Sequence, residues 1–315
     1  MTAVRLSLAS DSGLAEAVGA LPGVEVVTWD LDGPPPTPEI DIVVPPYWGG
    51  VARLARVAET RARLLQWQSI GFDGVAEVVP TSVAVANAAT VHEDSTAEVA
   101  MALALAAQRG IPEFVRAGDR GHWELVQFPS FVDRRVLIVG YGGVGKALDA
   151  RLQGFGVQVT RLATSARVDR GPSGDPVPVR GIDDLHDALA DAEIVFLAVP
   201  LTPRTRHLID AAALAAMPDG ALLVNVARGA VVDTAALVAE LAAGRLRAAL
   251  DVVDPEPLPP DHPLWRGPNV LISPHVGGDS SAMLPRISAL IHRQLGHLQR
   301  GEPFENVVLP AGRDR

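Results

Sequence analysis

The sequence predicts an α/β protein with two domains, each built on a parallel sheet that helices cover on both faces. Three observations carry this prediction. The chain has 315 residues, enough for two well-buried cores, and 48% of them are hydrophobic. Short apolar runs alternate with helical patterns along most of the chain, as in βαβ units. A glycine-rich turn follows one of these runs, at residues 140–145.

The first domain is expected to be a small α/β unit. The proline-rich run 34–38 is expected to be an exposed connector, because proline cannot join a central strand. Apolar runs predict strands at 4–8, 24–29, 42–44, 64–68 and 83–85, and helical patterns predict helices over 14–18 and 51–60.

The strongest helical pattern covers residues 95–109. It is rich in alanine, starts with Ser95 three positions before Glu98, and is expected to stop at 110–112. A polar segment, 116–127, then leads into the second domain. There the patterns predict strands at 136–139, 157–162, 194–199, 222–226, 248–252 and 270–272, with helices over 183–190, 211–216 and 234–243.

A further long helix is predicted over 281–300, beyond the last strand of the second domain. Such a helix can pack back onto the first domain and make that domain discontinuous in sequence. The predicted domains are therefore residues 1–101 with 282–315, for the substrate, and residues 102–281, for a dinucleotide.

The glycine-rich turn suggests what the second domain binds. The apolar run 136–139 is followed by Gly140, Gly142 and Gly145, spaced G-x-G-x-x-G, and then by a helical pattern. In a strand–turn–helix unit of this kind the first glycine makes the tight turn, the second lets the backbone approach a pyrophosphate, and the third allows close helix–strand packing. The helical pattern covers 146–152, and the N-terminus of that helix offers N–H groups to the phosphates. Gly143 and Val144, inside the turn, are also expected to bind the cofactor. A doubly wound, Rossmann-type sheet is therefore expected.

Composition excludes several other functions. The net charge of −10 argues against a nucleic-acid partner. The absence of cysteine excludes disulfides, thiolate metal sites and thiol catalysis, and no metal site is expected. The apolar run 99–107 is too short to cross a membrane, and the start of the chain lacks the apolar core of a signal peptide. We therefore expect a cytoplasmic protein with no membrane partner.

Three short segments follow predicted strands of the second domain and contain Arg228, Glu256 and His275. Ligands of open parallel sheets bind outside the carboxyl ends of the strands, so these side chains are expected to converge. A guanidinium binds a carboxylate at two points, and histidine transfers protons near neutral pH. A carboxylate next to the histidine orients the ring and favours its protonated form. This set suits the reversible reduction of a 2-keto acid.

These segments resemble the D-isomer-specific 2-hydroxyacid dehydrogenase family, over about residues 60–300. The matching stretches are 136–145, 199–205, 225–229, 251–258, 263–265 and 275–278. The resemblance implies a Rossmann cofactor domain, a smaller flavodoxin-like α/β substrate domain, and a homodimer formed through the cofactor domain. It further implies that His275 is the acid/base, Glu256 its carboxylate partner and Arg228 the anchor of the substrate carboxylate.

The resemblance also implies contacts that the residue types alone do not define. The backbone of Ser69, Ile70 and Gly71 is expected to hold the other side of the substrate carboxylate. Asp251 matches a position that contacts the nicotinamide carboxamide. The remaining cofactor contacts are expected along the strand ends, at Val199, Pro200, Thr205, Ala227, Arg228, His275 and Gly277.

The expected ribose-binding acid is missing. An acid normally ends the second strand of the dinucleotide fold and binds the ribose 2′-OH, but Ala163 takes its place here, and no Asp or Glu lies between residues 151 and 168. Thr164, Ser165 and Arg167 follow. Loss of the acid and gain of hydroxyls and a guanidinium favour a 2′-phosphate, hence NADP(H) over NAD(H). The alternative is a diverged loop that accepts NAD(H).

The expected activity is that of a glyoxylate or hydroxypyruvate reductase, with a small 2-keto or 2-hydroxy acid as partner. A cofactor-sensing regulatory protein on the same fold is the alternative, although a sensor needs no proton relay. In the formate branch of the family a glutamine replaces the carboxylate, so Glu256 argues against that chemistry.

Overall fold

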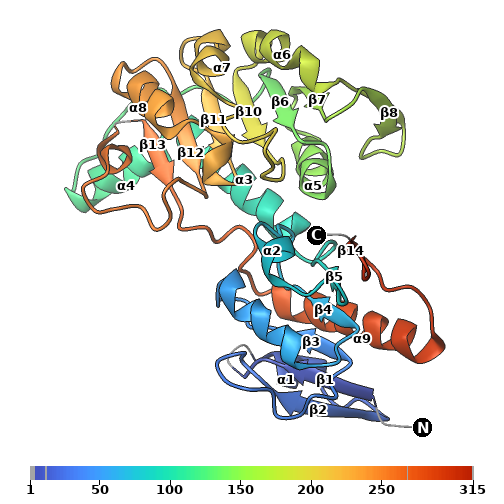
Figure 1. Ribbon diagram of the computed structural model, residues 1–315. Helices are drawn as coiled ribbons and strands as arrows, with labels where there is room; N and C mark the ends of the chain where they lie inside the picture. The colour runs from blue at the N-terminus through green and yellow to red at the C-terminus, as the bar shows by residue number, and fades with distance from the viewer. Residues whose placement is uncertain (1–3, 11–12, 268, 314–315) are drawn as a thin grey trace. The chain divides into compact units, whose positions relative to one another are not determined.

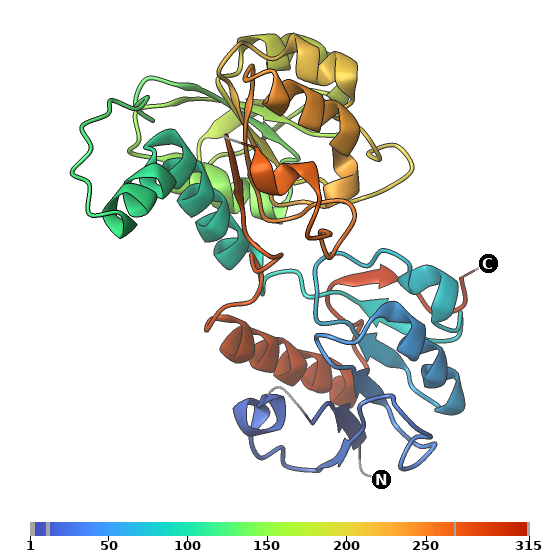
Figure 2. The same ribbon diagram turned by 90° about the vertical axis from the view of Figure 1, so that its left-hand side faces the viewer.

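A computed structural model describes residues 4–10, 13–267 and 269–313. The chain forms two compact units, which we call the first unit (Met1–His92 with Asp279–Arg315) and the second unit (Glu93–Gly278). Figures 1 and 2 show that the start and the end of the chain both belong to the first unit. The second unit begins before the predicted boundary at residue 102, because the whole of helix α3 (Glu93–Gln108) packs against other elements of that unit.

The second unit contains a six-stranded parallel sheet, and all six strands were predicted. Its order is β13-β12-β11-β10-β6-β7, so the chain moves outward from β6 to β7 and then returns to the other side of β6 with β10. This reversal between β6 and β10 is the switch point of a doubly wound fold. The strands are β6 (Arg135–Val139), β7 (Gln158–Leu162), β10 (Ile194–Leu197), β11 (Leu222–Asn225), β12 (Arg247–Leu250) and β13 (Val270–Ile272).

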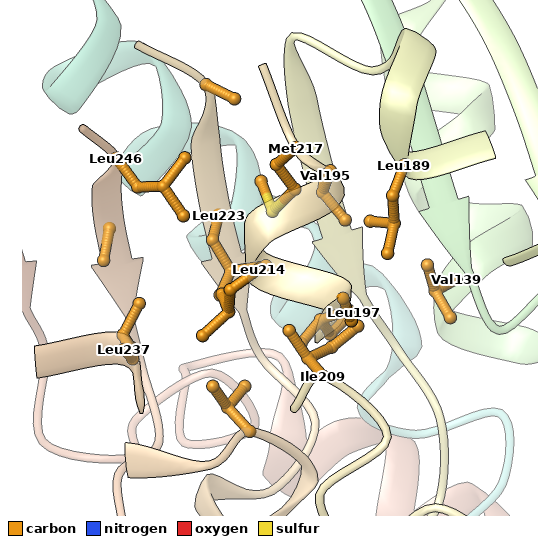
Figure 3. Close-up of a cluster of buried hydrophobic side chains, with 14 of the residues drawn as sticks. Val139, Leu189, Val195, Leu197, Ile209, Leu214, Met217, Leu223, Leu237 and Leu246 are labelled. Atoms are coloured by element: carbon orange, nitrogen blue, oxygen red, sulfur yellow. The ribbon is translucent and has the colours of Figure 1, made fainter. Parts of the chain in front are cut away.

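Helices cover both faces of this sheet. Alternate residues of a strand point to opposite faces, so Val195 and Leu197 join the cluster under α6 (Leu185–Asp191), α7 (Ala211–Ala216) and α8 (Thr234–Ala242), drawn in Figure 3. Ile194 and Phe196 join the opposite cluster, under α3 and α5 (Gly143–Leu152). Burial of each such side chain contributes roughly 1.5–3 kcal/mol. Two-sided burial explains why the strands are continuous apolar runs.

The first unit contains a second six-stranded sheet, with the order β14-β5-β4-β3-β1-β2. Its five parallel strands have the flavodoxin-like order, and β14 joins the edge in antiparallel orientation. Helices α1 (Leu14–Val18) and α9 (Met283–Arg300) cover one face, and the 3₁₀ helix η1 (Val51–Glu59) and α2 (Val75–Val78) cover the other. The strands are β1 (Val4–Leu8), β2 (Val24–Thr28), β3 (Ile42–Val44), β4 (Leu64–Gln66), β5 (Ala84–Ala86) and β14 (Val307–Leu309).

Several elements differ from the sequence-based expectation, and the short helix α2 is one of them, because no helix was predicted there. Helix α4 (Ile111–Asp119) lies where only a helix stop and a polar segment were predicted, because Gly110, with φ of +65°, also starts a new helix that has proline in its first turn. An antiparallel hairpin, β8 (Arg167–Arg170) and β9 (Pro176–Val179), follows β7. Its prolines concealed it, yet a two-stranded hairpin tolerates them because one side of each strand has no pairing partner. The edge strand β14 was also missed.

Among the described residues, no helix has the length and apolar character needed to cross a membrane.

Candidate active site

The glycine turn lies between β6 and α5, at the switch point of the second unit. Gly140 has φ of +104°, and a Cβ there would lie 2.5 Å from the Ala198 carbonyl oxygen, so a side chain is excluded. A Cβ on Gly145 would lie 2.0 Å from the Gly140 carbonyl oxygen. A Cβ on Gly142 would meet nothing within 4 Å. The first and third glycines therefore let the elements pack closely, and the second leaves open space beside the backbone.

The N-terminus of α5 faces this turn. The helix begins at Gly143, and Gly142 supplies no side-chain cap. The N–H of Lys146 donates to Gly142 O at 2.9 Å, whereas the N–H groups of the preceding turn have no partner inside the helix. Unpaired N–H groups and the helix dipole favour an anion there. The turn and the helix start thus fit the pyrophosphate of a dinucleotide.

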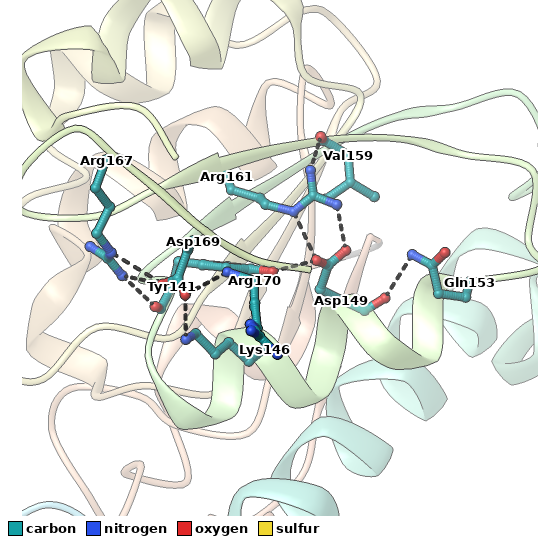
Figure 4. A network of polar contacts seen from close by, with 9 residues as sticks. All are labelled: Tyr141, Lys146, Asp149, Gln153, Val159, Arg161, Arg167, Asp169 and Arg170. Carbon is teal, nitrogen blue, oxygen red and sulfur yellow. Dashed lines mark hydrogen bonds and ion pairs between the residues drawn. The ribbon is translucent and has the colours of Figure 1, made fainter. Parts of the chain in front are cut away.

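A buried network fixes the turn to its neighbours (Figure 4). Tyr141, between the first two glycines, donates its hydroxyl proton to Asp149 Oδ2 at 2.6 Å, and Arg161 donates to both oxygens of Asp149, at 2.8 and 3.0 Å. Burial and, to a smaller extent, the hydrogen bond to Asp149 raise the pKa of Tyr141 to about 12. Tyr141 therefore remains a donor at neutral pH and ties the turn to α5 and β7.

A second polar cluster lies after β7, where the ribose-binding acid was expected. Ala163 ends the strand region, and Thr164 and Ser165 are exposed. Arg167 donates from Nη2 to the Tyr141 carbonyl oxygen at 3.0 Å and from Nε to Asp169 at 3.1 Å. Asp169 lies in β8, just past the acid-free stretch, so the residues after β7 do include a carboxylate.

The loop after β10 contains the predicted contacts Val199, Pro200 and Thr205. Val199 lies next to the glycine turn, since its Cγ1 is 2.9 Å from the position of a Cβ on Gly140. The Thr205 hydroxyl donates to the Pro200 carbonyl oxygen at 2.6 Å and accepts from the Thr202 N–H at 2.7 Å. In this structure the Thr205 hydroxyl closes its own loop.

The loop after β11 holds Arg228. Buried Asn225 accepts from the Ala227 N–H at 3.0 Å and donates to the Arg228 carbonyl oxygen at 3.0 Å, which fixes the backbone on both sides of the turn. The Arg228 guanidinium donates to the Ala227 carbonyl oxygen at 2.7 Å. A Cβ on Gly229 would lie 1.9 Å from the Val253 carbonyl oxygen, so only glycine lets this loop touch the next one.

The loop after β12 positions the loop after β13. The buried Asp251 carboxylate accepts from the Ser273 hydroxyl at 2.6 Å and from the Val276 and Gly277 N–H groups at 3.0 and 2.9 Å. The Asp251 carbonyl oxygen accepts from the His275 N–H at 2.7 Å, and His275 has φ of +56°. Asp251 thus holds the histidine loop on both sides of His275 in a left-handed turn.

His275 and Glu256 form a hydrogen-bonded pair. His275 Nδ1 lies 2.9 Å from Glu256 Oε2, and the Val253 N–H donates to Glu256 Oε1 at 2.9 Å. Burial raises the pKa of Glu256, but the hydrogen bonds from His275 and Val253 and the charge of Arg228 outweigh burial and hold that pKa below its usual range. An ionised carboxylate only accepts, so Nδ1 carries the proton and Nε2 is left for chemistry.

The predicted loop 69–71 belongs to the first unit and follows β4. All three carbonyl oxygens accept hydrogen bonds: Ser69 O from the Ala88 N–H at 3.0 Å, Ile70 O from Asn87 at 2.8 Å and Gly71 O from Trp67 at 2.8 Å. Within the described ranges, no acceptor is found for the N–H groups of these three residues. Tied carbonyls with N–H groups left over are typical of an anion-binding loop.

The sequence matches the model of a known family over residues 101–277, which is described as the D-isomer specific 2-hydroxyacid dehydrogenase, NAD binding domain. This match spans more than half of the chain. The chain belongs to the D-isomer-specific 2-hydroxyacid dehydrogenase family. It is thus an NAD(P)-dependent oxidoreductase, and the predicted recognition and fold class are confirmed.

Several relatives of this dehydrogenase have known functions. It is 34% identical to a glyoxylate reductase of Thermofilum pendens, over 78% of this chain and 74% of the relative. It is 30% identical to the glyoxylate reductase/hydroxypyruvate reductase of Homo sapiens, over 89% of both chains. It is also 33% identical to a D-3-phosphoglycerate dehydrogenase of Methanocaldococcus jannaschii, but it spans only 46% of that protein.

Solved structures of the family agree with the fold of this dehydrogenase. A D-isomer specific 2-hydroxyacid dehydrogenase from Xanthobacter autotrophicus, in complex with NADPH and MES, has 29% identity and a TM-score of 0.80 over 98% of both chains. The NADPH-dependent glyoxylate/hydroxypyruvate reductase of Sinorhizobium meliloti, with NADP and sulfate, has 25% identity and a TM-score of 0.80 over 97% of this chain and 98% of that one.

Three residues that shape the site of this dehydrogenase were not singled out from the sequence. Asn225 and Gly229 lie on either side of Arg228. The sequence signal for Asn225 was a polar residue at the end of an otherwise apolar strand, and the signal for Gly229 was a glycine inside the family-like stretch 225–229. Asp169 lies in the hairpin that was not predicted. Each acts through a contact with a distant part of the chain or through local hydrogen bonding that residue type alone does not show.

The lowered pKa of Glu256 predicts a pH-dependent stability contribution. Because the folded pKa lies below the unfolded value of about 4.3, the ionised carboxylate stabilises the fold above that value, and the contribution is lost as the pH falls through the folded pKa. We expect urea midpoints of the wild type and Glu256→Gln to differ at pH 7 and to converge as the pH is lowered through the folded pKa of Glu256. A difference in midpoint that stays constant as the pH is lowered would show that the charge of Glu256 is not its source.

Proposed function

We propose that this dehydrogenase reversibly reduces a small 2-keto acid of the glyoxylate or hydroxypyruvate type to the D-2-hydroxy acid. The observation that carries the proposal is the His275–Glu256 pair, which lies in the same unit as the glycine turn and has Arg228 close enough to lower the pKa of Glu256. Relatives named glyoxylate reductase and glyoxylate reductase/hydroxypyruvate reductase support this substrate class.

Each of the three residues has a separate part in the reaction. Arg228 binds the substrate carboxylate at two points and polarises the adjacent carbonyl. His275 donates a proton from Nε2 to the keto oxygen during reduction and removes it from the hydroxyl in the reverse direction. Glu256 holds the ring through Nδ1 and stabilises the imidazolium form. The bound nicotinamide cofactor supplies the hydride in one direction and accepts it in the other.

We propose NADP(H) rather than NAD(H) as the preferred cofactor. The support is the alanine at position 163, the exposed hydroxyls of Thr164 and Ser165, and Arg167 beside the glycine turn. Two similar solved structures, from Xanthobacter autotrophicus and Sinorhizobium meliloti, contain NADPH or NADP. Asp169 introduces an opposing charge, but two cations bind it.

The other predicted contacts remain proposals. The turn and helix start, Gly140, Gly142, Gly143, Val144 and Gly145, would hold the pyrophosphate. Asp251 would hold the nicotinamide carboxamide through its remaining acceptor capacity, because an ionised carboxylate accepts about four hydrogen bonds. The N–H groups of Ser69, Ile70 and Gly71 would bind a substrate carboxylate. The cofactor would contact Val199, Pro200, Thr205, Ala227 and Gly277.

A panel of 2-keto acids, each assayed with NADPH and with NADH, tests the proposed activity. We expect turnover of glyoxylate and hydroxypyruvate, with kcat/KM about tenfold or more higher with NADPH. Bulkier 2-keto acids and aldehydes without a carboxylate serve as controls and should react poorly. Absence of turnover with every 2-keto acid would contradict the function, and a preference for NADH would contradict the cofactor assignment alone.

We further propose that the protein is a homodimer formed through the second unit. Seven of the twelve exposed large hydrophobic side chains among the described residues lie between Ile111 and Val132, and Trp123 is 93% exposed. A patch of this kind marks a protein interface. Sedimentation velocity should show a dimer, which Trp123→Glu with Leu125→Glu should dissociate and the control Trp265→Glu should not. A wild-type monomer at micromolar concentration would contradict this.

A cofactor-sensing regulatory role is not favoured, because the proton-transferring residues are intact. A cytoplasmic location remains a prediction from the sequence.

A further inference from the structure

A compact charged cluster, Lys146, Arg167 and Asp169, lies beside the glycine turn (Figure 4). Lys146 Nζ is 2.8 Å from Asp169 Oδ1, and Arg167 Nε is 3.1 Å from Asp169 Oδ2. The Arg170 N–H also donates to Asp169 Oδ1, at 2.8 Å. Lys146 is the only lysine of the chain and comes directly after the third glycine of the turn.

The cluster has a net positive charge. The hydrogen bond from Lys146, followed by that from the Arg170 N–H, lowers the pKa of Asp169 to about 2, so this carboxylate is ionised at neutral pH. Two cations thus share one anion. An ammonium has three N–H donors and a guanidinium has five, so the contacts with Asp169 use only part of their capacity. The remaining donors suit an anion with several oxygens.

The position of the cluster matches the adenosine end of a dinucleotide. Arg167 reaches the Tyr141 carbonyl oxygen inside the glycine turn, and Lys146 Nζ lies 5.8 Å from the centre of the Tyr141 ring. The cluster also follows β7, the strand whose end faces the adenosine ribose in dinucleotide-binding sheets. Lys146 comes from α5 and Arg167 from β8, so the two cations approach from separate elements.

We propose that Lys146 and Arg167 together bind the 2′-phosphate of NADP(H), and that Asp169 holds the two cations in place. Lys146 is then a residue that determines cofactor specificity. This inference rests on the proposed use of NADP(H). Before the cofactor binds, Asp169 reduces the repulsion between the two cations. When the cofactor is bound, both cations interact with the negative charge of its 2′-phosphate. Lys146 acts as a point charge, whereas Arg167 supplies directed donors.

Binding measurements on Lys146→Gln test this proposal without reliance on turnover. We expect the ratio of the NADH Kd to the NADPH Kd, from fluorescence titration, to fall about tenfold, the size of one charge-assisted hydrogen bond. Calorimetry should show adenosine 2′,5′-bisphosphate binding weakened about tenfold relative to adenosine 5′-monophosphate. Lys146→Arg should recover most of the loss. Added salt should bring the Kd ratios of the wild type and Lys146→Gln closer together, because salt screens the charges of a partly exposed site.

The matched control is Arg151→Gln. Arg151 lies on the same helix and carries the same charge, but it pairs with Asp94 at 3.1 Å and Glu98 at 3.5 Å, away from the cluster. We expect the Kd ratio of Arg151→Gln to equal that of the wild type. If the Kd ratio falls equally in Lys146→Gln and Arg151→Gln, the effect comes from the overall charge of the protein, and the specific role of Lys146 is overturned.

Two results separate this inference from the proposed function. A wild type that prefers NADPH, together with an unchanged ratio in Lys146→Gln, would overturn the inference and leave the cofactor assignment intact. A wild type with no preference for NADPH would overturn both, because the cluster would then have no phosphate to bind.

Discussion

Replacement of His275 by alanine is expected to lower kcat by about 10²- to 10⁴-fold, the range that general acid–base catalysis contributes. The reason is the pair described above: Glu256 accepts from Nδ1 at 2.9 Å, so Nε2 is the atom that exchanges the proton with substrate oxygen. Without the ring, the developing alkoxide has no positioned donor. Stopped assays with excess enzyme and NADPH give the residual rate, and fluorescence titration shows whether cofactor binding persists.

Two further variants accompany His275→Ala: a control at a distant histidine and a test of the carboxylate partner. His186 is exposed on α6, so His186→Ala should keep wild-type kcat. Glu256→Gln should give an intermediate loss, because the ring keeps a hydrogen-bond partner but loses the charge that stabilises the imidazolium. If His275→Ala retains kcat within a few-fold of wild type, His275 is not the proton donor and the assigned roles are wrong.

Replacement of Arg228 by alanine is expected to lower kcat/KM for a 2-keto acid by about 10²- to 10⁴-fold. Two charge-assisted hydrogen bonds of roughly 1.5–3 kcal/mol each are lost, and so is the polarisation of the carbonyl. Arg228→Lys should recover little, because an ammonium cannot bind a carboxylate at two points in one plane. In Arg228→Lys most of the loss should appear as a raised KM. In Arg228→Ala kcat should fall and KM should rise.

The control for this experiment is Arg266→Ala, an exposed arginine of the same unit. It should leave kcat/KM unchanged. A further comparison uses a substrate without a carboxylate, such as a small aldehyde: the loss of kcat/KM in Arg228→Ala should be much smaller with the aldehyde, because only the polarisation of the carbonyl is then lost. An equally large loss with the aldehyde would show that Arg228 supports the fold or the cofactor and is not the carboxylate anchor.

The sequence predicted most of the fold because the strands are buried on both faces. Runs such as 136–139 and 194–197 have no polar interruption, and that pattern leaves little choice of secondary structure. The elements that were missed depend on something other than periodicity. Helix α4 starts at a glycine that also ends α3. The hairpin β8–β9 contains prolines, which a strand tolerates only where the missing N–H has no strand partner to bind.

The candidate site was predictable where chemistry requires particular residue types. Arg228, Glu256 and His275 each lie in the loop that follows a strand, and the structure brings Glu256 and His275 into hydrogen-bonding contact. The supporting contacts were not predictable, because they join atoms far apart in the sequence. Position 229 must be glycine because the backbone of Val253 leaves no room for a Cβ. Lys146 contacts Asp169, which lies in a hairpin that was not predicted from the sequence.

The discontinuous first unit has a consequence for the order in which the protein folds on the ribosome. Helix α9 covers one face of that unit through Ile287, Leu290 and Ile291, yet it is synthesised after the entire second unit. The second unit has all its strands once residue 278 has emerged, and domains generally fold as units during synthesis. Until α9 is synthesised, one apolar face of the first unit is covered by α1 alone. Nascent chains are therefore most exposed to aggregation through the residues made first.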